Sequence, residues 1–237
     1  MGNNYFQFKE FKIEQDLCAM KVTTDACIQG AWTPILPNVA RVLDVGVGTG
    51  LLCLMLAQRN KDILIDGIEF DKDAVVQAGD NINASPWKDR VCILEGDVRD
   101  HDFVHKYDLI ISNPPFFNDS LLSSNDSKNL ARHTLFLSYP DLLKVLEAHL
   151  LEDGYASIML PFTEYQEWKD LLAQNGWFEL GSLSVSHTIT APVKRVVGIF
   201  GKNKIAAINE QSLAICDNDN KYTPAFIHLL SQFYLNL

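Results

Sequence analysis

The feature that most constrains the fold is a regular alternation that starts near residue 41. Apolar runs of strand length alternate with amphipathic stretches of helix length, and glycine-rich or polar turns separate them. This alternation is typical of doubly wound α/β proteins, in which helices cross over between parallel strands. The expected strands are 41–45, 63–69, 91–94, 107–112, 155–160, 178–187 and 193–200, and the expected helices are 51–58, 72–83, 140–150 and 164–175.

The last two expected strands, 178–187 and 193–200, are joined by residues 188–192 alone. A crossover between parallel strands needs about a dozen residues or more, so this pair must be antiparallel. We therefore expect an α/β, Rossmann-like fold with a seven-stranded, mostly parallel sheet, an antiparallel last strand and helices on both faces. Short strands are expected at 6–8 and 11–13, and helical spacing of apolar residues predicts a packing helix within 222–237.

Composition is that of an ordinary globular protein, because 47% of the 237 residues are hydrophobic and 21% are charged. No run approaches the roughly 18 apolar residues of a membrane span, and the first residues lack the regions of a signal peptide. The five cysteines form no CxxC pair, which predicts reduced thiols in a cytoplasmic protein. His101 and His105 stand four apart without a Glu or Cys partner at ligand spacing, so no metal site is expected.

The formal net charge is −10, which by itself argues against a nucleic-acid partner. The charge is unevenly distributed, however. Acids are concentrated in residues 62–108, whereas residues 181–209 contain four basic residues and no acid. These cations are Lys194, Arg195, Lys202 and Lys204. Such a strip suits contact with a few phosphates, and it equally suits a solvated sheet edge protected by lysine. The sequence leaves both interpretations open.

Asn113, Pro114, Pro115 and Phe116 directly follow the expected strand 107–112. Two consecutive prolines donate no backbone hydrogen bond and hold φ at about −65°, so the strand stops and the turn is stiff. In open α/β sheets, ligands bind at the carboxyl ends of strands. The Asn113 amide oxygen and the Pro114 carbonyl can accept both hydrogens of a planar –NH2 group, while the Phe116 ring stacks on its plane. This corner therefore predicts chemistry on an exocyclic amine.

The turn between the first expected strand and the first helix contains Gly46, Gly48 and Gly50, with Asp44 just before it. Glycines let the backbone approach a ligand closely and leave helix N–H groups free. Nicotinamide and flavin enzymes use similar turns, but here Leu51 stands where the dinucleotide fingerprint has its third glycine. Asp44 would repel a pyrophosphate, whereas its charge suits the ammonium of a methionine group. We therefore favour S-adenosyl-L-methionine over NAD as the cofactor.

Two more acids follow neighbouring strands. Glu69 ends the second strand, about where an acid meets ribose hydroxyls in nucleotide-binding folds. The alternative is a helix cap, although Asp71 can fill that role. Asp97 follows the third strand, where it could accept a hydrogen bond from an adenine amino group. Asp100 competes with Asp97 as a helix N-cap candidate.

The glycine turn, Glu69, Asp97 and the 113–116 corner, in this order, resemble the class I S-adenosylmethionine-dependent N-methyltransferases. Over nearly its whole length the chain more closely resembles the bacterial tRNA1(Val) (adenine(37)-N6)-methyltransferase family. This closer resemblance is carried by Phe8, Lys9, Phe11, Cys18, Ala19, Met20, Lys21, Val22, Thr24, Asp25, Gly30, Ala31, Trp32, Asn81, Ile82, Asn83, Ser85, Pro86, Trp87, Gln232, Phe233, Tyr234 and Leu235. The corner marks only the superfamily, and the amino-terminal block is the specific part.

The resemblance implies one methyltransferase domain over the whole chain, in which residues 1–35 cover the cofactor site and residues 36–237 form the catalytic core. It also implies that Lys21, Thr24 and Asp25 lie near the methionine end of the cofactor. Spacing alone would make these three residues a helix N-cap region. The implied substrate is a tRNA anticodon loop, and the implied acceptor is N6 of the adenosine 3′ to the anticodon.

The expected reaction is methyl transfer to an amine whose lone pair is delocalised into the base. Asn113 and Pro114 would accept its two hydrogens and so favour a pyramidal nitrogen, without a strong general base. The family often carries Tyr where this chain has Phe116, so the corner alone does not separate adenine enzymes from guanine-N2 enzymes of ribosomal RNA. Residues 117–129 are either a flexible lid or an ordinary surface loop.

Lys128 and Arg132 follow in a position to reach phosphate, and His133 is a weaker candidate for contact with substrate. Three rival functions stay open. The first is the same chemistry on another amine, either guanine N2 or a protein glutamine. The second is a nicotinamide-dependent reductase, and the third is a non-catalytic binding module on the same fold.

Overall fold

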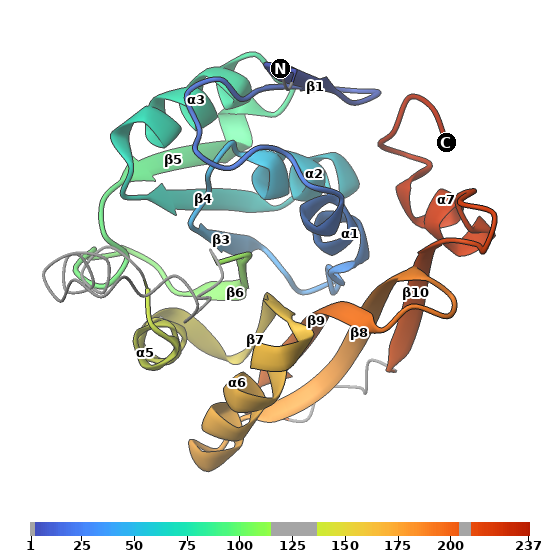
Figure 1. Ribbon diagram of the computed structural model, residues 1–237. Coiled ribbons are helices and arrows are strands. Elements are labelled where there is room, and N and C mark those ends of the chain that lie inside the picture. Colours follow the sequence, from blue (N-terminus) through green and yellow to red (C-terminus); the bar gives the residue numbers. More distant parts are fainter. Residues whose placement is uncertain (1–2, 115–136, 204–209) are drawn as a thin grey trace, which may run out of the picture.

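The computed structural model describes residues 3–114, 137–203 and 210–237 (Figure 1). Within them, one sheet has eight strands in the order β10-β8-β9-β7-β6-β3-β4-β5. The strands are β3 (Arg41–Val45), β4 (Leu64–Glu69), β5 (Val91–Glu95), β6 (Tyr107–Ser112), β7 (Leu150–Pro161), β8 (Phe178–Thr188), β9 (Val193–Gly201) and β10 (Gln211–Cys216). The expectations for Pro115, Phe116, the 117–129 loop, Lys128, Arg132, His133 and Lys204 lie outside the described residues.

The sheet is parallel except at β9, which runs antiparallel to both β7 and β8. The predicted hairpin between the last two expected strands is therefore confirmed. Its physical cause is the short connection, which leaves no room for a crossover helix. At the centre of the sheet, β3 pairs in parallel with both β4 and β6, so the carboxyl ends of these three strands meet at one edge.

The predicted strand count was one too low, because the sheet continues past the hairpin into β10, which pairs in parallel with β8. The antiparallel strand is thus β9, and the last strand in the chain is parallel to its neighbour. β10 is a short edge strand in which only Leu213 and Cys216 are buried. Its sequence does carry an apolar run, 213–216, which is as long as that of the expected strand 91–94, so this run was a usable signal.

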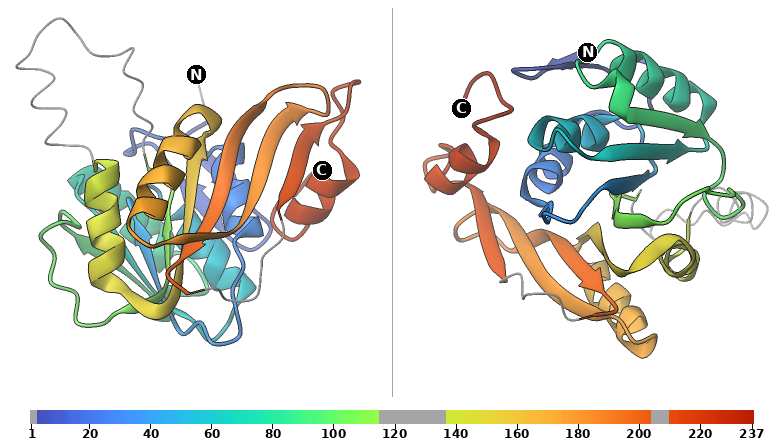
Figure 2. Two further views of the ribbon diagram at one scale, coloured as in Figure 1. Left: turned by 90° about the horizontal axis from the view of Figure 1, so that it is seen from below. Right: turned by 180° about the vertical axis from the view of Figure 1, so that it is seen from behind.

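Helices cover both faces of the sheet, as expected (Figure 2). They are α1 (Thr24–Trp32), α2 (Leu51–Arg59), α3 (Lys72–Asn83), α5 (Tyr139–His149), α6 (Phe162–Gln174) and α7 (Pro224–Leu230). The Asp71 carboxylate accepts a hydrogen bond from the Ala74 N–H and so caps α3, and Ser138 caps α5 in the same way. Beyond the end of α6, Gly176 has a φ of +78°, which glycine adopts without strain.

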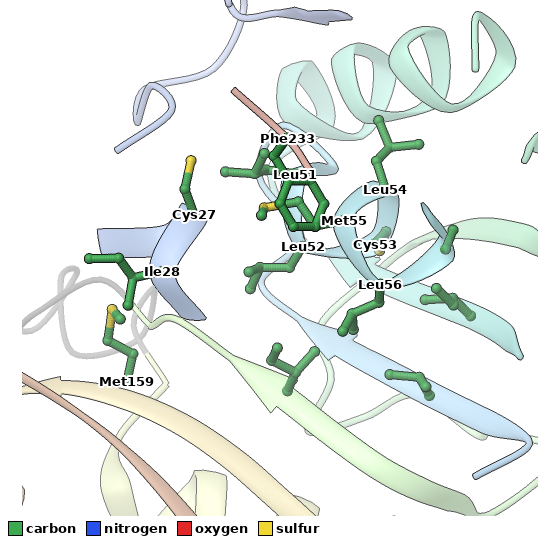
Figure 3. Packing of buried hydrophobic residues seen from close by; sticks show 14 of the residues in the cluster. Cys27, Ile28, Leu51, Leu52, Cys53, Leu54, Met55, Leu56, Met159 and Phe233 are labelled. Carbon is green, nitrogen blue, oxygen red and sulfur yellow. The ribbon is translucent and has the colours of Figure 1, made fainter. Parts of the chain in front are cut away.

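Two buried clusters lie on the two faces. On one face Ile28 of α1 and Met55 of α2 belong to a cluster that also includes Ile111 of β6 (Figure 3). On the other face Trp168 of α6 packs in a cluster with Ile110 of β6. Neighbouring residues of β6 thus point to opposite faces, as the pleat of a strand requires. This double burial explains why the expected strands read as continuous apolar runs.

The two ends of the chain pack together. Tyr5–Gln7 (β1) and Lys12–Glu14 (β2) are the two short strands expected at 6–8 and 11–13, each displaced by one residue, and they pair antiparallel. The Lys9 N–H donates to the Phe233 carbonyl at 2.8 Å, and Phe8 forms an isolated bridge with Tyr234. The tail helix α7 is shorter than the segment in which it was expected. Among the described helices, none has the length and hydrophobicity needed to cross a lipid bilayer.

Candidate active site

A pocket of about 420 Å³ opens at the carboxyl ends of the central strands, a volume typical of a small-molecule site. It is lined by the glycine turn after β3, the end of β4, the turn after β5, the Asn113–Pro114 corner after β6, and the amino-terminal segment (residues 3–22). Of the residues proposed from sequence, it brings together Gly46, Gly48, Glu69, Asp97, Asn113 and Pro114. Asp44, Gly50, Lys21, Thr24 and Asp25 are not among its lining residues.

The turn after β3 has a backbone that favours glycine. Gly46, Gly48 and Gly50 have φ values of +77°, +52° and +83°, in the left-handed region that other residues rarely adopt. A Cβ on Gly46 or Gly48 would meet nothing within 4 Å, so backbone conformation rather than crowding selects glycine there. Gly50 is also the N-cap of α2 and supplies no side-chain cap. The turn therefore leaves open space beside its backbone at the pocket, and the first N–H groups of α2 have no side-chain cap.

Glu69 connects β4 to the glycine turn. Its Oε2 accepts a hydrogen bond from the Gly48 N–H at 3.0 Å, and its Oε1 accepts from the N–H groups of Phe70 and Asp71 at 3.0 and 3.1 Å. A carboxylate offers about four lone-pair positions, so Glu69 can also accept a hydrogen bond from a hydroxyl in the pocket. Asp71 caps α3, so the helix-cap alternative for Glu69 is not realised.

Asp97 lines the pocket together with Arg99. The Oδ1 of Asp97 accepts hydrogen bonds from the backbone N–H and the Nε of Arg99, both at 2.9 Å, and its Oδ2 accepts from the other end of the guanidinium. These hydrogen bonds hold the pKa of Asp97 below its usual value, so this carboxylate is ionised at neutral pH. Residues 101–106, which follow Asp100 directly, form no helix, so the N-cap alternative is wrong.

Asp44 is fully buried near the end of β3, and in the chain it directly precedes Val45 and Gly46. The Cys53 thiol donates to its Oδ2 at 3.2 Å, whereas its Oδ1 has no hydrogen-bond partner among the described residues. Burial raises the pKa of Asp44 to about 7, against the opposing effect of the Cys53 hydrogen bond. A buried acceptor without a partner beside a glycine turn is suited to a cationic hydrogen-bond donor.

The Asp44→Asn variant should be more stable than the parent protein above pH 7, because it removes a buried charge. The folded-state pKa of Asp44 is raised from 3.8 to about 7. The contribution of Asp44 to the free energy of unfolding of the parent protein is therefore fully present below about pH 4, and it is lost as the pH rises through about 7. The gain should reach a few kcal/mol near pH 8 and vanish near pH 4. Urea unfolding at several pH values measures it, and a gain that does not vary with pH would contradict this reasoning.

The Asn113–Pro114 corner is held in place from behind by a buried glutamine. Gln29 of α1 is fully buried, and its Nε2 donates to the carbonyls of Ser112 and Ser157 at 3.0 and 3.1 Å. The Ser112 hydroxyl in turn donates to the Val45 carbonyl at 2.8 Å. The residue that precedes the corner is thus tied to α1 and to β3. Because the pocket lining includes Asn113 and Pro114, the corner faces the same space as the glycine turn.

The amino-terminal segment forms one wall of the pocket through Cys18, Ala19 and Met20. Burial, with the charges of Glu69 and Asp71, raises the pKa of Cys18 to about 11, so its thiol stays protonated at neutral pH. Beyond this wall, Lys21, Thr24 and Asp25 have other contacts. The Lys21 Nζ donates to the Asn3 carbonyl at 3.2 Å, Thr24 begins α1, and Asp25 forms a 3.2 Å ion pair with Arg195. Their contact with a cofactor stays a prediction.

Two side chains of α3 fasten the amino-terminal segment to the core. Asn81 accepts from the Glu14 N–H and donates to the Glu14 carbonyl, both at 2.8 Å, as a neighbouring strand would. It also donates to the Thr49 carbonyl in the glycine turn at 2.9 Å. Gln77 accepts from the Leu17 N–H at 3.0 Å, directly before the pocket wall begins. The position of the wall therefore depends on α3.

Replacing Asn81 by alanine should loosen this wall. The change removes three hydrogen bonds and leaves buried backbone groups without partners, so the free energy of unfolding should fall by about 1–3 kcal/mol. Ligand affinity in the pocket should fall as well. Asn83→Ala is the matched control, because Asn83 lies on the same helix and is exposed. Urea unfolding compares the stability of the two variants, and calorimetric titration compares their affinity for S-adenosyl-L-methionine. Equal stability and equal affinity would show that the contacts of Asn81 do not hold the wall.

The chain was then compared with known proteins. It is 41% identical over 238 residues to the tRNA1(Val) (adenine(37)-N6)-methyltransferase of Tolumonas auensis, and the alignment covers 100% of this chain and 99% of the relative. It is 40% identical over 236 residues to the protein of the same name from Dyadobacter fermentans, with 98% of each chain covered. The chain belongs to this family. Residues 33–136 also match the family model named Methyltransferase small domain.

Solved structures show the same fold in more distant proteins. A predicted O-methyltransferase from Agrobacterium tumefaciens aligns with a TM-score of 0.65 at 16% identity, over 90% of this chain and 100% of the other. The structure of P. horikoshii TYW2 in complex with MeSAdo aligns with a TM-score of 0.57 at 17% identity, over 86% of this chain and 74% of the other. The methyltransferase fold expected from the sequence is therefore confirmed for this member of the family.

Sequence reasoning missed three contributors to the pocket and its support. Gln29 acts on carbonyls far along the chain, so no local pattern marks it. Arg99 was not singled out, although it stands two residues after Asp97 and pairs with it. Gln77 was likewise missed, but it lies one helical turn from Asn81 on the same face of α3, and that spacing was a usable signal. The described residues contain no cluster of acids, histidines or cysteines able to hold a metal ion.

Proposed function

We propose that this protein transfers a methyl group from S-adenosyl-L-methionine to N6 of adenosine 37 in tRNA1(Val). Relatives that are 37–41% identical over nearly the whole chain carry the name of this activity. The observation that carries the proposal is that Asn113 and Pro114, which can accept from an amine, line the same pocket as Glu69, which can accept from ribose hydroxyls. The substrate region is then the anticodon loop, and the activity belongs to the cytoplasm.

The pocket residues fit S-adenosyl-L-methionine. Gly46 and Gly48 leave space beside the backbone for a ligand, and Glu69 has lone pairs for ribose hydroxyls. The Oδ1 of Asp44, which lacks a partner among the described residues, supports an ammonium group near the end of β3. Asp97 is proposed to accept from the adenine amino group. Because Arg99 already donates to both of its oxygens, Asp97 has only its remaining lone pairs for this contact.

Bound S-adenosyl-L-methionine supplies an electrophilic methyl group on a sulfonium. The residues of this chain position the acceptor. The Asn113 amide oxygen and the Pro114 carbonyl accept the two amine hydrogens, which favours a nitrogen whose lone pair is available for attack. Pro115 stiffens the corner, and Phe116 is proposed from the sequence to stack on the base. Gln29 holds the Ser112 carbonyl, so the corner needs little reorganisation.

The amino-terminal segment is proposed to cover the cofactor. Cys18, Ala19 and Met20 form a wall of the pocket, and Lys21 follows them directly. In this view residues 1–35 are an extension of a single methyltransferase domain whose core is residues 36–237. Lys21, Thr24 and Asp25 would reach the methionine end of the cofactor from this side. Covering the donor also keeps water from the reacting methyl group.

A genetic test addresses the function in the cell. In a strain that lacks the gene, purified tRNA1(Val) should contain unmodified adenosine at position 37, and N6-methyladenosine should return when the gene is restored. Nucleoside mass spectrometry of the isolated tRNA measures both. An unchanged tRNA1(Val) accompanied by loss of N2-methylguanosine from ribosomal RNA would contradict the proposal and favour the guanine alternative.

A further inference from the structure

Charge is distributed unequally along the edge of the sheet that carries the pocket. At the β4–β5 side the carboxyl ends of the strands and the turns after them carry Glu69, Asp71, Asp73, Glu95, Asp97 and Asp100. At the other side, residues 181–203 contain no acid, and Lys194 and Arg195 stand at the start of β9. Among the described strand ends along the edge, Asp217 and Asp219 are the acids nearest to this hairpin, because they follow β10, whose Cys216 is level with Thr188. A polyanion would therefore be repelled more strongly from the first side than from the β8–β9 hairpin.

The turn between β8 and β9 lies at the same edge as the pocket. Arg195 of β9 is level with Pro161 at the carboxyl end of β7, and β7 is the neighbour of β6, which leads into the Asn113–Pro114 corner. Two strand spacings of about 4.8 Å separate β6 from β9, so the two strands lie roughly 10 Å apart at this edge. The left view of Figure 2 shows this turn at the upper end of the sheet.

Exposed apolar side chains accompany these cations. Phe162 follows Pro161 directly and is 55% exposed, and Ile189 in the β8–β9 turn is 67% exposed. Lys194 is also exposed, whereas Arg195 is partly buried and pairs with Asp25 at 3.2 Å, which ties the hairpin to α1. Exposed rings beside a cation are the combination that binds unpaired nucleotides, because bases stack on rings and cations neutralise phosphates.

We propose that the β8–β9 turn and the start of α6 form the surface that binds the RNA backbone beside the target base. Lys194 contacts a phosphate, and Phe162 and Ile189 contact an unpaired base or its sugar. This inference rests on the proposed function and adds the direction from which the substrate arrives. It also explains how a protein with a net charge of −10 binds a polyanion, because the contact is centred on the β8–β9 hairpin, which carries cations and no acid.

The test measures the affinity of an unmodified tRNA1(Val) transcript as a function of salt. Each phosphate contact to a single strand contributes about 0.7 to the slope of log K against log salt, which is about four-fold in affinity at 0.15 M salt. Lys194→Gln should therefore weaken binding about four-fold and reduce the slope by about 0.7. Lys202→Gln is the matched control, since it removes the same charge at the other end of β9, where Lys202 pairs with Glu147.

A second pair of variants tests the apolar part of the surface. Phe162→Ala should weaken RNA binding about ten-fold without changing the salt slope, because a stacked base is lost rather than a phosphate contact. Leu151→Ala is its control, because Leu151 is similarly exposed but lies at the opposite end of β7. Cofactor affinity should be unchanged in all four variants.

The surface is contradicted if Lys194→Gln and Lys202→Gln have the same affinity and the same slope, or if Phe162→Ala binds like Leu151→Ala. This outcome leaves the proposed function standing when the parent protein still methylates the transcript. If the parent protein binds the transcript without methylating it, the proposed function fails, and the comparison of slopes still decides the surface. If the parent protein binds no RNA, both proposals fail.

Discussion

Replacing Asn113 by alanine is expected to lower kcat for methyl transfer by about 100-fold or more, with almost no loss of cofactor affinity. The amide oxygen accepts a hydrogen bond from the amine, and this contact strengthens as the nitrogen becomes pyramidal in the transition state. Losing one preorganised group of this kind typically costs about 100- to 1000-fold in kcat. Single-turnover methylation of tRNA, together with calorimetric titration of S-adenosyl-L-methionine, separates the two effects.

Asn113→Asp is the informative companion variant. It keeps an oxygen acceptor at the same position, so it should retain about ten-fold more activity than Asn113→Ala. Both variants should unfold at the same urea concentration as the parent protein, because Gln29 holds the Ser112 carbonyl through the backbone. Near-normal turnover in Asn113→Ala would show that the corner does not act on the amine.

Replacing Glu69 by alanine should produce the opposite pattern. The variant loses the acceptor for the N–H groups of Gly48, Phe70 and Asp71, and it also loses the proposed ribose contact. Hydrogen bonds to a charged group contribute about 1.5–3 kcal/mol, so the Kd for the cofactor should rise about 30-fold. At saturating cofactor, kcat should change only a few-fold, because Glu69 does not touch the reacting amine in this account.

The matched control for Glu69 is its register partner. Glu95 of β5 pairs with Glu69 across the parallel ladder but is not among the lining residues of the pocket. Glu95→Ala should therefore leave the cofactor Kd unchanged. Equal losses in Glu69→Ala and Glu95→Ala would point to a general effect of charge at this edge. Unchanged cofactor binding in Glu69→Ala would contradict the assignment of this pocket.

Much of the fold could be predicted because its signals are local. The strands 41–45 and 107–112 have the bounds expected from their apolar runs, and α3 begins at the residue after its cap, Asp71. The direction of β9 followed from the length of one connection. β10 was missed although it carries the apolar run 213–216, because this run is short and its pairing with β8 is decided by tertiary packing.

The candidate site was predictable where a single residue faces the pocket from the end of a strand. Glu69, Asp97 and Asn113 are of this kind. The supporting contacts were not predictable, because they join residues that are distant in the sequence. Gln29 reaches Ser157 across 128 positions, and no local pattern records such a contact. Asp44 was expected to line the site, but the structure buries it behind the lining residues. Its link to a ligand rests on its Oδ1, which has no hydrogen-bond partner among the described residues.

The most direct measurement is transfer of a labelled methyl group to defined tRNA1(Val) transcripts by the purified protein, followed by nucleoside identification. One transcript carries adenosine at position 37 and the other guanosine. The account predicts labelled N6-methyladenosine at position 37 of the first transcript and no label in the second. Label on N2 of guanosine, or at any other position of the first transcript, would contradict it.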